Sequence, residues 1–71
     1  MKLYELERDK GIKIYGAKAR DTGEDVVIIF GHLDGAYSYC WLENDSSKVV
    51  HLSASTPLTK YKDGYKIDGG A

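Results

Sequence analysis

The longest apolar run of the chain, residues 26–30, constrains its fold more than any other segment. The run reads Val-Val-Ile-Ile-Phe, and adjacent β-branched side chains favour an extended strand. The turn-forming pair Asp34 and Gly35 follows shortly after, and residues 37–42 then alternate aromatic with small or aliphatic side chains. This order predicts a β-hairpin with strands at about residues 25–33 and 36–43.

The turn dipeptide also predicts the register of this hairpin. If Asp34 and Gly35 form a type I′ turn, Phe30 lies opposite Tyr39 and Cys40 opposite Ile29. One face then carries Val26, Ile28, Phe30, His32, Tyr37, Tyr39 and Trp41. The other face, which we expect to line a tight barrel, carries Val27, Ile29, Gly31, Leu33, Ala36, Ser38, Cys40 and Leu42.

The small size of the chain limits its stability and its location. A single domain of 71 residues buries only about 60% of its unfolded surface, so partner subunits would help to stabilise it. The single cysteine excludes an internal disulfide, and with no leader-like N-terminus we expect a cytoplasmic protein. No apolar run approaches the roughly 20 residues of a membrane span, so no membrane partner is expected. A formal charge of −1 means that any nucleic-acid site must be a local patch.

Turn and cap signals predict the remaining elements. Leu3 and Leu6 lie among charged residues before Gly11, which is typical of a short helix over about residues 2–10 that packs on the aromatic face. Turn-forming clusters and Pro57 separate strands at about residues 12–18, 48–54 and 58–62, and residues 68–71 form a tail. A short helix and about five strands predict an all-β domain, a small and strongly bent five-stranded barrel.

In this order of elements the chain resembles the Sm-like family of RNA-binding proteins, and two segments resemble its small phage-type members. These segments are residues 31–35, Gly-His-Leu-Asp-Gly, and residues 51–58, His-Leu-Ser-Ala-Ser-Thr-Pro-Leu. The resemblance implies an Sm-like barrel, a relative of SH3-like barrels, over residues 1–71. It also implies a homo-oligomeric ring in which the fourth strand of one subunit pairs with the fifth strand of the next.

The resemblance also implies where nucleic acid would bind. Sm-like proteins usually read RNA with an Asp and an Asn near the turn between the second and third strands, and with an Arg-Gly or Lys-His step between the fourth and fifth. This chain has His32, Asp34 and Tyr37 at the first place. It has Ser55 and Thr56 at the second place, where the arginine that lines the ring is missing.

Two groups of residues suggest a binding site by their own chemistry. In the predicted register His32 faces Tyr37 at the hairpin tip, where a base could stack, although the pair could also simply pack across the strands. Lys60, Lys62 and Lys66, interleaved with tyrosines, form the only basic and aromatic cluster. Such a cluster suits phosphates, although charged edge strands also exist to prevent aggregation.

Catalysis is the least favoured function. Cys40 and His51 are the only nucleophile and base that the predicted strands bring together, because a loop at residues 44–47 would place them opposite each other. No third group is evident to orient the imidazole, and a buried cysteine is the better account. The histidines and the cysteine also lack zinc-ligand spacing, so we expect no enzyme, metal or cofactor.

The sequence therefore predicts a non-enzymatic protein that binds single-stranded RNA or DNA as a homo-oligomeric ring. The predicted nucleic-acid-binding residues are His32, Asp34, Tyr37, Ser55, Thr56, Lys60 and Lys62. The alternative is an interaction or structural barrel that grips another protein, which the near-neutral charge favours.

Overall fold

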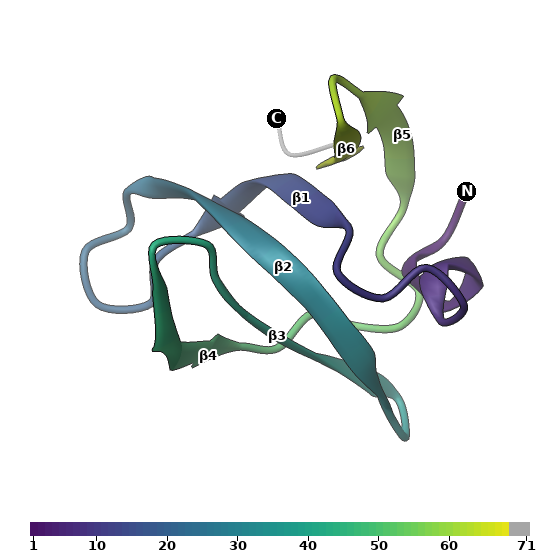
Figure 1. The fold of residues 1–71 in the computed structure, drawn as a ribbon, viewed down its shortest axis with the longest axis horizontal. Helices are drawn as coiled ribbons and strands as arrows, with labels where there is room; N and C mark the ends of the chain where they lie inside the picture. Colours follow the sequence, from purple (N-terminus) through teal and green to yellow (C-terminus); the bar gives the residue numbers. More distant parts are fainter. Residues whose placement is uncertain (69–71) are drawn as a thin grey trace.

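Six β-strands and one 3₁₀ turn make up residues 1–68, the part of the chain that the computed structural model describes (Figure 1). The turn, η1, spans only Leu3–Leu6, so the predicted helix over residues 2–10 is wrong. The strands are β1 (Lys13–Lys18), β2 (Asp25–Asp34), β3 (Tyr37–Leu42), β4 (Asp45–Val50), β5 (Leu58–Tyr61) and β6 (Gly64–Ile67). The prediction of a mostly β protein is confirmed. Of the predicted tail, residues 69–71 lie outside the described residues.

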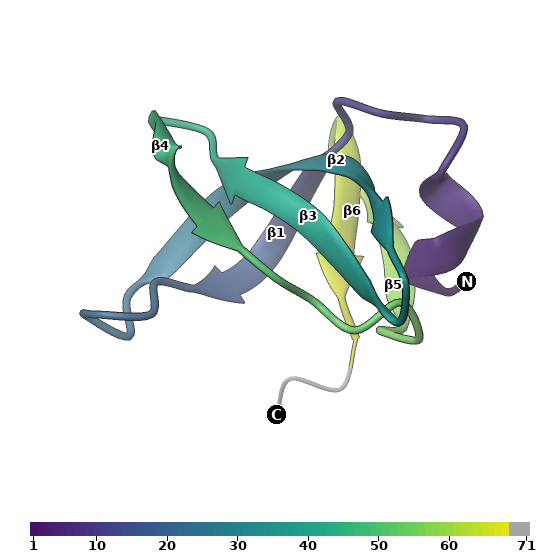
Figure 2. The same cartoon turned by 90° about the horizontal axis from the view of Figure 1, so that it is seen from below.

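The strands form one curved, open sheet in the order β4-β3-β2-β1-β6-β5 (Figure 2). The pairing of β1 with β6 is parallel, whereas the other pairings are antiparallel. The structure therefore corrects the predicted five-stranded barrel, because the sheet has a sixth strand and is not closed. The sixth strand follows a tight turn at Lys62 and Asp63, which folds β6 back between β1 and β5.

The β2–β3 turn lies one residue later than the sequence predicts. Asp34 pairs with Tyr37, so the two turn residues are Gly35 and Ala36. Gly35 has a φ of +65°, and no positive φ occurs at Ala36, which is the pattern of a type II′ turn. The predicted type I′ turn at Asp34 and Gly35 is therefore wrong.

A bulge at Gly31 changes the register of the same hairpin. His32 pairs with Tyr39, whereas Phe30 pairs with Cys40 instead of the predicted Tyr39. A slip of one residue moves a strand's side chains to the opposite face of the sheet. The N-terminal half of β2 consequently turns Ile28 and Phe30 inward, opposite to the predicted faces, while β3 keeps Cys40 inward as predicted.

The buried core residues come from η1, β1, β2, β3 and β5, and partly buried side chains of β4 and β6 pack against them. The buried members of the core are Leu3, Leu6, Ile14, Ala17, Ile28, Phe30, Cys40, Leu42 and Leu58. Because Leu3 and Leu6 are completely buried in it, η1 plugs the core and does not cover an aromatic face. Tyr39 keeps 36% of its surface exposed, so the predicted packing of this residue under the helix is wrong.

The β3–β4 hairpin also differs from its prediction. Leu42 pairs with Asp45 across a two-residue turn, and β4 therefore begins before the predicted residue 48 and ends at Val50. Cys40 pairs with Val50 and not with His51. A register shift within β4 absorbs the residues that the sequence assigned to a longer loop.

Candidate nucleic-acid interface

Four rings gather on the outer surface of β2 and β3, and we call them the aromatic cluster: His32, Tyr39, Trp41 and His51. The His32 ring stacks on the Tyr39 ring with centroids 5.1 Å apart and planes at 13°. The Trp41 ring lies 6.3 Å from Tyr39, and the His51 ring lies 6.1 Å away, edge to face. Tyr39 is thus the centre of the cluster, and it remains partly exposed together with both histidines.

The sequence of β3 explains why these rings face outward. The strand buries Ser38, Cys40 and Leu42, and alternation sends the tyrosines and Trp41 to the other face. Gly31 makes room for Trp41, because a Cβ at this position would lie only 2.6 Å from Cζ3 of the indole. The glycine at the bulge therefore leaves β2 without a side chain at the point where the indole lies on the strand.

The β5–β6 hairpin carries the second group, which we call the basic hairpin: Lys60, Lys62 and Lys66 with Tyr61 and Tyr65. The Lys62 Nζ lies 5.2 Å from the Tyr61 ring centroid, and the Lys66 Nζ lies 5.5 Å from it. The Lys60 Nζ lies 5.2 Å from the Tyr65 centroid. These are cation–π distances, so each ammonium group is held beside an aromatic ring.

A polar network anchors the basic hairpin to β1. The Tyr15 hydroxyl donates a 2.6 Å hydrogen bond to Asp63, and the Lys13 Nζ lies 3.2 Å from the same carboxylate. Lys13 also pairs with Glu43 at 2.8 Å, so it joins the β3–β4 turn to the β5–β6 turn. The Tyr15 and Lys13 hydrogen bonds lower the pKa of Asp63, and the bonds to Glu43 and Asp63 raise the pKa of Lys13.

This network has an electrostatic consequence for the hairpin lysines. Lys13 shares its single positive charge between Glu43 and Asp63, and no ion pair joins Lys60, Lys62 or Lys66 to a carboxylate among residues 1–68. The three ammonium groups therefore have no carboxylate within ion-pair distance, and they lie beside the exposed Tyr61 and the half-buried Tyr65. Phosphate groups could pair with them.

The aromatic cluster lies on the same face of the curved sheet as Tyr61 and Lys66 of the basic hairpin, whereas Lys60 and Tyr65 project to the core-facing side. Trp41 pairs with Ile29, which in turn pairs with Lys13 on β1. Lys13 and Tyr15 share a face by alternation, and Tyr15 pairs with Lys66 on β6. Since directly paired residues project to the same side of a sheet, this face is continuous from β3 to β6.

An open hollow of about 450 Å³ lies beside the aromatic cluster. It is lined by Arg20 from the β1–β2 loop, Asp34 and Tyr37 beside the β2–β3 turn, and His51 after β4. Tyr37 is 60% exposed. His51 belongs both to this hollow and to the aromatic cluster, so the two features adjoin.

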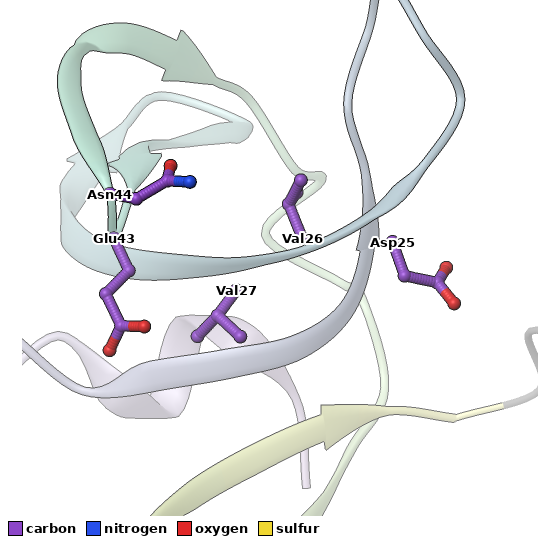
Figure 3. Close-up of a pocket in the computed structure, with 5 residues that line it drawn as sticks. All are labelled: Asp25, Val26, Val27, Glu43 and Asn44. Atoms are coloured by element: carbon purple, nitrogen blue, oxygen red, sulfur yellow. The ribbon is translucent and has the colours of Figure 1, made fainter.

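A smaller hollow of about 190 Å³ lies between the start of β2 and the β3–β4 turn (Figure 3). Its lining combines two valines with Asp25, Glu43 and Asn44. Asp25 pairs with Lys18 at 2.6 Å and Glu43 pairs with Lys13, and Figure 3 shows the two carboxylates pointing in different directions. Both charges already have partners, and we assign no function to this hollow.

The structure distributes the predicted site residues over four places. His32 contacts Tyr39, so the predicted pairing of His32 with Tyr37 is wrong. Asp34 and Tyr37 lie together at the hollow, while Lys60 and Lys62 lie in the basic hairpin.

Ser55 and Thr56 lie apart from these groups, in the segment between β4 and β5. The Leu3 amide donates to the Thr56 carbonyl at 2.9 Å, so η1 holds this segment. The Ser55 hydroxyl is exposed and lies 2.9 Å from the hydroxyl of Ser53. Ser55 and Thr56 therefore belong to a connecting segment that is hydrogen-bonded to the N-terminal turn η1.

Sequence reasoning missed several residues of the interface. Tyr39 and Trp41 were expected to be covered, although their alternation with small residues already showed that they share a face with Tyr37. Tyr15 and Arg20 carried no local signal, because tertiary structure alone brings them to the basic hairpin and to the hollow.

Cys40 is built as a core residue. It is completely buried, and burial raises the pKa of its thiol, so the reactive thiolate is disfavoured. Its Sγ lies 3.3 Å from the Ser38 hydroxyl, which also bonds the backbone of Leu52. Because Cys40 pairs with Val50, the predicted opposition of Cys40 and His51 is wrong.

Residues 1–68 contain no group of three or more His, Cys, Asp or Glu side chains placed to hold a metal ion. Within the same range, no helix has the length and apolar character needed to cross a membrane.

Comparison with known proteins gives the chain no relative. No protein-family model, no curated protein and no solved structure matches it.

Proposed function

We propose that this protein binds single-stranded RNA or DNA on the outer face of its sheet and catalyses no reaction on it. The observation that carries the proposal is the partly exposed Tyr39, with the His32, Trp41 and His51 rings around it, on the same face as Tyr61 and Lys66 of the basic hairpin. Aromatic rings on a sheet can stack with unpaired bases, and lysines beside them can neutralise phosphates.

The energies of these contacts suit a chain of low net charge. Stacking of one base on one aromatic ring is worth about 1–3 kcal/mol and tolerates any base. The formal net charge of −1 gives no long-range attraction to nucleic acid, so the local lysines must supply it. We therefore expect weak, strongly salt-dependent binding by one subunit.

We further propose that the subunits assemble into a homo-oligomeric ring of the Sm-like kind. The short N-terminal helical turn followed by a long second strand supports this kinship, and the additional β6 is a departure from it. The sheet ends in two strands, β4 and β5, and end strands can pair with those of another copy. Light scattering should then give a mass several times the 7.9 kDa of one chain, and a stable monomer at micromolar concentration would contradict the ring.

A salt titration tests the binding proposal. Replacing Lys62 and Lys66 by alanine should reduce the slope of log affinity against log salt by about 1.4, because each lost phosphate contact on a single strand removes about 0.7. The matched control replaces Lys2 and Lys10, two exposed lysines outside the hairpin, and should leave the slope unchanged. Fluorescence anisotropy of a labelled oligonucleotide gives both slopes.

The alternative function is a module that binds another protein. Val49 pairs with Trp41 on the outer face and is 38% exposed, so apolar surface continues from the aromatic cluster onto β4. If the wild type binds no single-stranded RNA or DNA even at about 50 mM salt, where electrostatic contacts are strong, this alternative replaces the nucleic-acid proposal.

A further inference from the structure

The hollow beside the aromatic cluster contains polar groups that the fold itself does not use. Among residues 1–68, no hydrogen bond or ion pair engages the side chains of Arg20, Asp34, Tyr37 or His51. The volume of about 450 Å³ is within the range of roughly 300–1,000 Å³ that small-ligand sites occupy. The hollow thus offers a carboxylate, a guanidinium, an imidazole and an exposed phenol ring to a ligand.

The carboxylate decides which nucleobase fits this set. An ionised aspartate only accepts hydrogen bonds, and its two oxygens can accept two parallel bonds. Guanine is the base whose Watson–Crick edge carries two adjacent donors, N1–H and the N2 amino group. Adenine and cytosine offer one amino group beside an acceptor, and uracil offers one N–H between two carbonyls.

The other groups complete a nucleotide site. The exposed Tyr37 ring can stack on the base, and Arg20 supplies a positive charge for the phosphate, which the Asp34 carboxylate would otherwise repel. His51 also contacts Tyr39, so a strand leaving the hollow would continue onto the aromatic cluster.

We propose that this hollow binds one guanine base of a bound single strand, with Asp34 accepting the hydrogen bonds of N1–H and N2. This inference rests on the proposed function and adds base selectivity to it. No group of the hollow is assigned to the ribose, so the site would bind a guanine in RNA or in DNA.

Labelled oligouridine strands of about 12 nucleotides, within the usual site size, test the proposal when one central base is varied. Guanine should bind roughly 5- to 100-fold more tightly than adenine or uracil, because a bidentate contact gives about this discrimination. Inosine, which lacks only the N2 amino group, should lose most of the advantage. The same series in deoxyribonucleotides shows whether RNA, DNA or both are read.

Two variants connect the preference to Asp34. Asp34→Asn should abolish the guanine preference, so that a strand with a central guanine binds no more tightly than the all-uridine strand. Asp9→Asn makes the same charge change at an exposed aspartate outside the hollow and should keep the preference. Circular dichroism checks that both variants remain folded.

The unfavourable outcomes separate the two proposals. Binding without a guanine preference, or a preference that survives Asp34→Asn, overturns the guanine site and leaves the proposed function standing. A wild type that binds none of the strands overturns both.

Discussion

Gly64→Ala is expected to lower the free energy of unfolding by about 3 kcal/mol or more, the upper end of what overpacking costs. A Cβ on this buried residue would lie 2.1 Å from the carbonyl oxygen of Lys13 and 2.9 Å from its carbonyl carbon. These atoms belong to the backbone of β1, which cannot rotate away as a side chain could. The two strands must separate, and β6 then loses its parallel pairing with β1. Urea denaturation followed by circular dichroism measures the loss.

Gly23→Ala is the matched control for this prediction. Gly23 has a φ of +72° but no atom within 4 Å of the added Cβ, so the substitution meets only backbone strain of about 1–2 kcal/mol. Equal losses in the two variants would show that the close approach of β6 to β1 is not what requires a glycine at residue 64.

Tyr39→Ala has the largest effect expected on binding. The substitution removes the ring that contacts His32, Trp41 and His51, and it should weaken binding of a single strand by about 1–3 kcal/mol while the salt slope is preserved. Tyr4→Ala is the control, because Tyr4 is 53% exposed on η1, away from the outer face. A loss of similar size in Tyr4→Ala would mean that the aromatic cluster has no special role.

The two Asp-Gly pairs of the chain show how accurately a turn dipeptide predicts the position of a hairpin turn. The same Asp-Gly pair occurs at residues 34–35 and 63–64, and each lies within one residue of a real turn. At the first, Gly35 takes the positive φ that the turn needs. At the second, Lys62 takes a φ of +48° instead, and Gly64 becomes a strand residue that lies against the backbone of Lys13.

The reason for this difference is tertiary. A non-glycine residue at positive φ is unfavourable, and here the position where a side chain would collide with β1 is occupied by the glycine. Local sequence preference places a turn approximately, and the packing of distant strands decides its register. The later turn leaves the faces of the hairpin unchanged, but the extra residue of the bulge at Gly31 exchanges them in the N-terminal half of β2, which is why Phe30 was assigned to the wrong side while Cys40 was not.

The sequence predicts those parts of the candidate site that are close together in the chain, but not those that tertiary structure assembles. Lys60, Lys62 and Lys66 are neighbours in sequence, so their clustering with tyrosines needed only a hairpin. The stacking of His32 on Tyr39 follows from the turn at Gly35 and Ala36, one residue later than the Asp-Gly pair predicts. Arg20 reaches the hollow from a loop in another part of the chain, and its position in the sequence does not predict that contact.

The fluorescence of Trp41 reports directly whether a single strand binds on the aromatic cluster. Trp41 is the only tryptophan of the chain, and it lies in the aromatic cluster. Titration with a single-stranded oligonucleotide at about 50 mM salt should produce a saturable change in its emission, with the same midpoint in Tyr4→Ala and a weaker one in Tyr39→Ala. A constant emission while anisotropy reports a bound strand would contradict binding on the aromatic cluster. The absence of any binding would contradict the proposed function.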